Sequence, residues 1–187
     1  MKSIILSTFI MLFSLILVTP TFASENEDKV LEELSQKGEI IYKDDEITVR
    51  SFGNDPEISE AIFNHSNSIV KNENNANDNI ITPFGATGSG GWSSITASDS
   101  GRSVYWSVKP ATLWPFHFTG LVKLRYYSGF KRDAPIGGMG IAGQTISGSV
   151  SMNKNNGGIA YLSGTAYAVT GDRYKVLPGV NVSFRPN

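Results

Sequence analysis

The sequence predicts a mainly β protein: an antiparallel β-sandwich or a small barrel over about residues 92–187, preceded by a short acidic α/β-hairpin segment. Three observations lead to this prediction. Apolar and polar residues alternate with period two in several short runs after Gly91. Turn-forming residues separate these runs at short intervals. All three tryptophans and 17 of the 19 glycines follow Phe84, so the composition changes class at one place.

The alternation predicts six or seven short strands. In the first, Val104, Trp106 and Val108 share one face. In another, Ile146 and Val150 alternate with a row of serines. Six of these expected strands span residues 103–109, 121–127, 145–152, 159–170, 174–177 and 180–184. The pattern leaves sandwich and barrel open.

Turn chemistry supports the strand boundaries. Residues 155–158, Asn-Asn-Gly-Gly, favour a hairpin because Asn and Gly tolerate positive φ. Pro178-Gly179 suits a type II turn. Residues 128–143 contain five glycines and a Lys-Arg pair, and we expect a long connection there, of the kind that often forms a binding loop.

The acidic segment predicts two short helices and a hairpin. Ser24 with Glu27 forms a capping box for the first helix. Residues 39–43 and 46–52 flank an Asp-Asp turn and alternate as a hairpin does. Asp55-Pro56 then supplies an N-cap and first-turn proline for a second helix, whose apolar face is formed by Ile58, Ala61, Ile62 and Ile69.

The chain divides into four parts. Residues 1–23 have the features of a secretory signal peptide: Lys2, an apolar run over 9–18 and the small-x-small site Thr21-Phe22-Ala23. We expect export and an extracellular, cell-wall-associated location. The remaining parts are an acidic segment over 24–71 that is a candidate pro-region, an Asn/Gly-rich linker over 72–91 and a basic β domain over 92–187.

Charge and cysteine content limit the function further. Residues 24–84 carry a net charge of −9 and residues 85–187 a net charge of +7. There is no cysteine, which excludes disulfides, thiol nucleophiles and cysteine-based metal sites. Export without cysteine is typical of Gram-positive secreted proteins.

The sequence contains few candidate catalytic residues. His65 lies in the second predicted helix, where we expect it to be solvated. His117 has no nucleophile elbow or orienting carboxylate near it in sequence. The carboxylates of the β-rich part, Asp99, Asp133 and Asp172, all have turn-like neighbours. The sequence therefore predicts no catalytic residue, no metal site and no cofactor, with a hydrolase using His117 as a remaining alternative.

A group of basic and aromatic residues is the candidate binding site. Cations in such a group attract anionic polymers, and exposed rings stack on sugars. The opposing interpretation is that the charges are the solvated side of a strand and that Trp106 and Trp114 belong to the core. The candidate site comprises Trp114, His117, Lys123, Arg125, Tyr127, Phe130, Lys131 and Arg132.

The leading functional hypothesis is a secreted, non-enzymatic binding protein. Its expected partner is an anionic cell-wall polymer, a glycan or a membrane surface, with no nucleic acid and no transmembrane segment after signal cleavage. A second hypothesis is an antimicrobial or toxin-like effector whose acidic segment is a pro-region that neutralises it.

Overall fold

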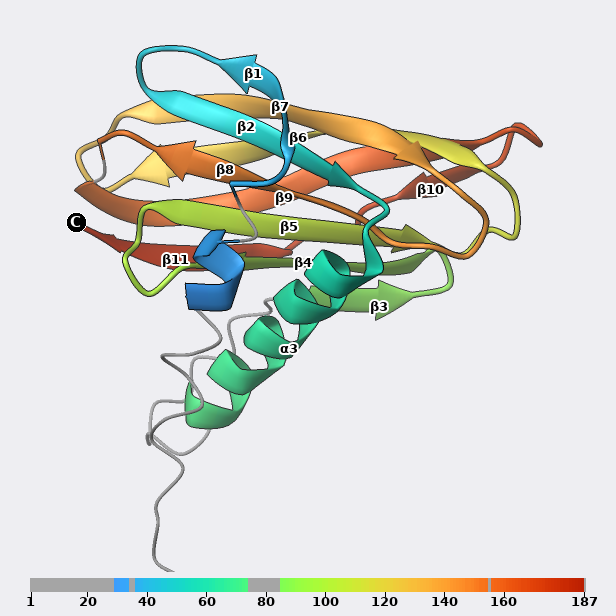
Figure 1. Ribbon diagram of the computed structural model, residues 1–187, viewed down its shortest axis with the longest axis horizontal. Helices are drawn as coiled ribbons and strands as arrows, with labels where there is room; N and C mark the ends of the chain where they lie inside the picture. Colours follow the sequence, from blue (N-terminus) through green and yellow to red (C-terminus); the bar gives the residue numbers. More distant parts are fainter. Residues whose placement is uncertain (1–28, 34–35, 74–84, 155, 187) are drawn as a thin grey trace, which may run out of the picture.

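The computed structural model describes residues 29–33, 36–73, 85–154 and 156–186. In the helix over residues 56–73, side chains are described only up to residue 66. Two antiparallel β-sheets pack together, and one long helix crosses the outside of one of them (Figure 1). The predicted signal peptide and residues 74–84 of the predicted linker lie outside the described residues.

The first sheet has six strands in the order β1-β2-β8-β5-β4-β3. Every neighbouring pair in it is antiparallel. Its strands are β1 (Glu39–Lys43), β2 (Ile47–Gly53), β3 (Gly85–Gly88), β4 (Gly91–Ala97), β5 (Ser103–Pro110) and β8 (Ile146–Met152).

The second sheet has five strands. Four follow the order β10-β9-β6-β7, and β11 also pairs with β9. Its strands are β6 (Phe116–Tyr126), β7 (Lys131–Gly140), β9 (Asn156–Ala168), β10 (Arg173–Lys175) and β11 (Asn181–Pro186).

The main core lies between the two sheets, and this identifies the fold as a sandwich rather than the alternative barrel. Trp106 of β5 and Phe118 of β6 meet across the layers, with ring centroids 5.8 Å apart. Both are fully buried, as are Val122 and Leu124 of β6 and Val150 of β8. The predicted β-sandwich is confirmed because the apolar face of each alternating strand is turned to the opposite sheet.

All six expected strands are present. The pattern missed β3, β4 and β7. The glycine-rich stretch 128–143, which we expected to be a connection, contains β7, paired with β6 along its length. Glycine allows this pairing because a Cβ at Gly140 would lie 2.2 Å from the Phe116 ring.

The hairpin expected in the acidic segment is part of the same sandwich. β2 pairs with β8, so β1 and β2 complete the six-stranded sheet. Ile47 and Val49 are fully buried in the main core. The acidic segment therefore supplies core side chains to the basic part of the chain.

The helix α3 (Pro56–Glu73) packs on the outer face of the six-stranded sheet. The predicted N-cap is confirmed: Asp55 Oδ1 accepts hydrogen bonds from the backbone N–H of Glu57 (2.9 Å) and Ile58 (3.3 Å). Ile58 and Ile62 form a second buried cluster with Tyr105, joined by Leu31 from the helical residues 29–33.

His65 is buried under this helix, so the expectation that it would be solvated is wrong. It follows Ile58 and Ile62 at helical spacing and therefore faces the sheet, where its Nδ1 lies 3.0 Å from Thr96 Oγ1. The serines that alternate with the apolar residues of β8 also face the helix side of this sheet. Ser147 Oγ lies 3.3 Å from Ser59 Oγ of α3.

Residues 85–88, which we expected within a flexible linker, form the edge strand β3 against β4. None of the helices in the described ranges is long and apolar enough to cross a membrane.

Candidate functional site

The outer face of the five-stranded sheet presents most of the cations that the sequence singled out. Successive side chains of a strand point to opposite faces. On β6, Val122 and Leu124 fill the core, so Lys123 and Arg125 point outward. By the same alternation, neighbouring strands add further cations to this surface, which we call the basic face: Lys123, Arg125, Lys131, Arg173 and Lys175.

Cross-strand register fixes the neighbours on this face. Lys123 is opposite Tyr161 of β9 and Asp133 of β7. Arg125 is opposite Lys131. The face thus combines cations with the hydroxyl-bearing ring of Tyr161, which is 38% exposed.

Arg125 is held in place by several acceptors. Its Nη1 lies 2.6 Å from Asp133 Oδ1 and also donates to the carbonyls of Leu124 (2.9 Å) and Arg132 (3.2 Å). Because both side chains are partly exposed, we expect the ion pair to contribute at most about 1 kcal/mol to stability. Arg125 is therefore less available to a ligand than Lys123 or Lys131, which form no ion pair with any residue that the structure describes.

Arg132 does not belong to the basic face. It has the inward parity of Ala134 and lies at the edge of the sandwich, where it pairs with Asp44. Its Nη2 donates to Tyr42 Oη (2.9 Å), and its Nε lies 4.0 Å from Glu46 Oε2. Arg132 is thus neutralised by the acidic hairpin.

The aromatic residues of the predicted site divide between the two ends of β6. Tyr127 and Phe130 lie in the turn after this strand, where Phe130 packs on Tyr126 at 5.6 Å. Trp114 lies in the loop before it and is 56% exposed. A strand of this length spans roughly 35 Å, so the eight predicted residues do not form one site. The interpretation that both tryptophans belong to the core is correct for Trp106, which is buried, but not for Trp114.

His117 lies exposed on the outer face of β6. Its cross-strand neighbours are Met139 and Tyr167, neither of which provides a carboxylate to orient the imidazole. The register gives the hydrolase alternative no orienting group.

Sequence reasoning missed four residues of this face: Tyr161, Tyr167, Arg173 and Lys175. Arg173 lies over the Tyr167 ring, with its Cζ 5.6 Å from the ring centroid. Their alternation along residues 159–170 and 173–175 was visible in the sequence. The sequence did not show which strands pair with β9, because that depends on non-local pairing.

A cavity of about 470 Å³ lies between the start of α3 and the β7–β8 loop. Phe63 and Trp92 form one wall, with ring centroids 5.2 Å apart in an edge-to-face arrangement. Asn54 Nδ2 donates to Gln144 Oε1 (2.6 Å) near its rim. The cavity falls in the size range of small-molecule sites, but it lies on the helix side of the six-stranded sheet, away from the basic face.

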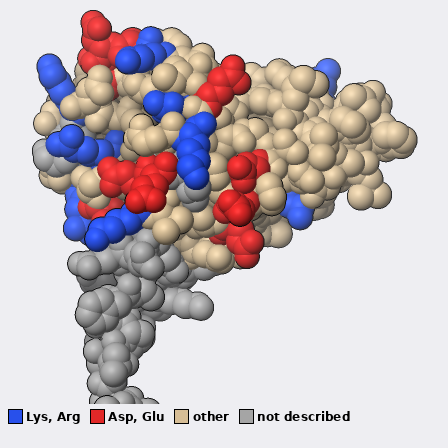
Figure 2. All heavy atoms as spheres, viewed as in Figure 1, with Lys and Arg blue, Asp and Glu red and all other residues tan. Residues whose placement is uncertain are grey.

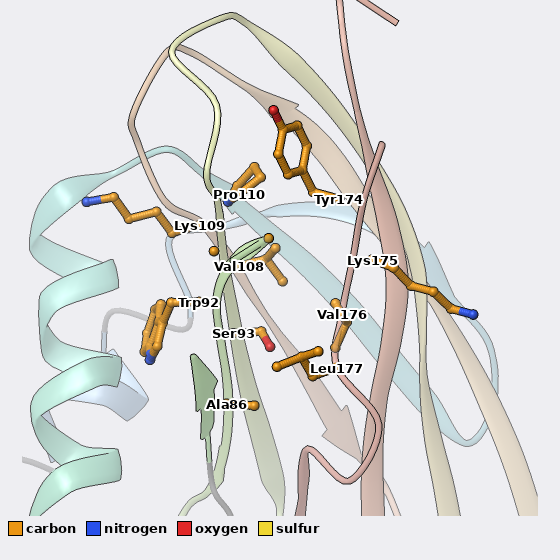
Figure 3. A pocket seen from close by; sticks show the side chains of 12 residues that line it. Ala86, Trp92, Ser93, Val108, Lys109, Pro110, Tyr174, Lys175, Val176 and Leu177 are labelled. Carbon is orange, nitrogen blue, oxygen red and sulfur yellow. The ribbon is translucent and has the colours of Figure 1, made fainter. Parts of the chain in front are cut away.

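A second hollow lies beside β10, between Tyr174 and the strands β4 and β5 (Figure 3). Its volume of about 20 Å³ accommodates one water molecule and no organic ligand. Figure 3 also shows the side chains of Trp92 and Lys109 directed toward α3, away from this hollow.

Charge is unevenly distributed along the molecule. In Figure 2, acidic and basic side chains intermingle at the left-hand end of the visible face, and the opposite end is almost free of charge. Within the described ranges, no group of three or more His, Cys, Asp or Glu side chains is placed to hold a metal ion.

No protein-family model matches this sequence, and no curated protein matches it.

Proposed function

We propose that this chain is a secreted, non-enzymatic binding protein of the cell envelope, whose basic face binds extended anionic polymers. The observation that carries the proposal is the cross-strand register, which places Lys123, Lys131, Arg173 and Lys175 on one exposed sheet face where the strands contribute one carboxylate, Asp133. A surface with this excess of cations concentrates polyanions through its summed potential.

The spacing of the cations favours a polymer over a small anion. Lys123 and Lys175 lie on different strands, at register positions on the order of 15 Å apart. No single phosphate bridges that distance, whereas a chain of repeated phosphates or carboxylates contacts several cations in turn. Tyr161 adds a ring on which a sugar unit of the polymer can stack.

Salt dependence tests the proposal. We expect the mature protein to be retained on purified Gram-positive cell wall at low ionic strength and released as salt rises, because screening weakens contacts between exposed charges. Lys123→Gln with Lys131→Gln should weaken retention about three- to tenfold, since each exposed contact contributes a fraction of a kcal/mol to about 1 kcal/mol.

The matched control is Lys43→Gln with Lys154→Gln, which removes the same charge from exposed positions outside the basic face. This control should bind almost as the wild type does. Equal losses in both double variants, or full retention on wall stripped of its anionic polymer, would count against the basic face.

A further inference from the structure

A second surface, at the uncharged end of the sandwich, goes beyond the proposed polymer binding. Three loops meet there: β5–β6 (111–115), β7–β8 (141–145) and β9–β10 (169–172), all at the right-hand end in Figure 1. Their most exposed large apolar side chains, with the adjacent Met139, form what we call the apolar tip: Leu113 (85% exposed), Trp114 (56%), Met139 (73%), Ile141 (53%) and Val169 (71%).

The degree of exposure at the tip needs an explanation. Single exposed apolar residues are normal, but a contiguous group marks an interaction site. The loops carry one charged residue, Asp172, whose carboxylate Oδ2 accepts a hydrogen bond from Thr170 Oγ1 at 2.7 Å. In Figure 2 this end of the visible face is correspondingly almost free of charged side chains.

Backbone hydrogen bonds hold the loops together. The N–H of Val169 donates to the carbonyl of Pro115 (3.1 Å), and the N–H of Gly143 donates to that of Thr112 (3.2 Å). These bonds join all three loops and satisfy polar groups that would otherwise be costly to remove from water. The tip is thus preorganised, with its apolar side chains already outward.

Cations stand directly behind the tip on both sheets. Arg173 lies over Tyr167 on the five-stranded sheet. Lys109 is exposed near the end of β5, on the other sheet, just before the loop that carries Leu113. Apolar side chains ahead, aromatic rings at the boundary and cations behind are the arrangement of an interfacial membrane anchor.

We propose that the apolar tip inserts into the headgroup and upper acyl region of a lipid bilayer, with Arg173 and Lys109 contacting anionic headgroups. The tip is formed by protruding loops, whereas a stable protein–protein interface needs a wide surface that is flat or grooved. The tip is therefore better suited to a deformable lipid surface than to a partner protein. The basic face and the apolar tip share Arg173 and otherwise use different residues.

Vesicle binding tests this proposal. We expect the mature protein to co-sediment with vesicles of phosphatidylglycerol and phosphatidylcholine at 1:1, and more weakly with phosphatidylcholine alone. Leu113→Ser with Trp114→Ser should lower the partition coefficient at least about tenfold, because two large apolar side chains no longer enter the lipid. Tyr127→Ser is the matched control, an exposed ring (67%) at the opposite end of β6, and should bind as the wild type does.

Two further variants separate insertion from surface attraction. Trp114→Phe should bind nearly normally but lose the quenching of tryptophan fluorescence by brominated lipid, since Trp106 is buried and the half-buried Trp92 packs against Phe63 of α3, away from the tip. Lys109→Gln with Arg173→Gln should weaken binding to the anionic vesicles and leave binding to neutral vesicles unchanged.

The proposal is overturned if Leu113→Ser with Trp114→Ser binds vesicles as well as the wild type does. It is equally overturned if the wild type ignores vesicles, or if sedimentation shows a dimer that this variant abolishes, since the tip would then bind a second copy. Failure here with normal retention on cell wall would leave the basic face unaffected.

Discussion

At the scale of single residues, adjacent side chains on one strand have opposite roles. Lys131 is exposed on the basic face, whereas Arg132 points to the sandwich edge and pairs with Asp44. Because a strand alternates at every residue, a cluster of cations in sequence is divided between two surfaces. Of these two residues, Arg132 therefore has a structural role, whereas Lys131 belongs to the basic face.

Tyr126 gives a prediction at this scale. Burial, and secondly the nearby Glu46 carboxylate, raise the pKa of Tyr126 from 10.0 to about 12. A group whose pKa is raised on folding stabilises the fold fully below its unfolded pKa, and that contribution is lost as pH rises through the folded pKa. The free energy of unfolding should therefore fall between pH 10 and 12, by at most about 3 kcal/mol.

Urea unfolding of the wild type and Tyr126→Phe at pH 9, 10, 11 and 12 measures this contribution. Other groups that titrate in this window affect both proteins alike. The wild type should lose more stability than the variant over the same window. Parallel pH profiles would show that the phenol does not titrate as described.

At the scale of elements, glycine decides how closely strands and rings approach. Gly148 of β8 faces Trp106 of β5 in the register, and its neighbour on the other side is β2. A Cβ there would lie 2.4 Å from the Arg50 carbonyl oxygen and 2.6 Å from the Trp106 ring. Neither the strand backbone nor the buried indole has room to move.

Gly148→Ala should therefore destabilise the protein by about 2 to 4 kcal/mol, because β2 must shift away from β8 or the indole must leave its position. Thermal or urea unfolding measures the change. Gly90→Ala is the control, since a Cβ at Gly90 meets nothing within 4 Å, and it should change stability by less than about 1 kcal/mol. Similar losses in both variants would contradict the steric argument.

At the scale of the whole molecule, the acidic and basic halves of the sequence share one core. Val49 of β2 is buried in the main core, and Ile58 and Ile62 of α3 cover Tyr105. The pro-region hypothesis would therefore require release of two strands and a helix from the folded protein. Removing them exposes one edge of β8 and the apolar surface beneath α3.

A truncation tests this point. We expect the fragment 85–187 to lack a cooperative thermal transition and to aggregate, whereas the chain from residue 24 unfolds cooperatively. Circular dichroism and calorimetry of both measure the difference. A fragment that folds on its own, with a sharp transition, would revive the pro-region hypothesis.

Local pattern was sufficient to predict much of this molecule. The six alternating strands, the Asp55 cap and the Pro178-Gly179 turn, where Gly179 has φ of 90°, all depend on neighbours in sequence. The glycine-rich β7 escaped prediction because its stability comes from pairing with β6 and from the Phe116 ring above Gly140, both distant in sequence.

The sequence by itself determined the fold class, the positions of most strands and the segregation of charge along the chain, because these depend on composition and short-range periodicity. Only the tertiary structure decided that the acidic hairpin joins β8, that Arg132 is neutralised while Lys123 lies half-buried on the basic face, and that three apolar loops meet at one end. Those outcomes depend on which strands pair, and strand pairing links residues that no local pattern connects.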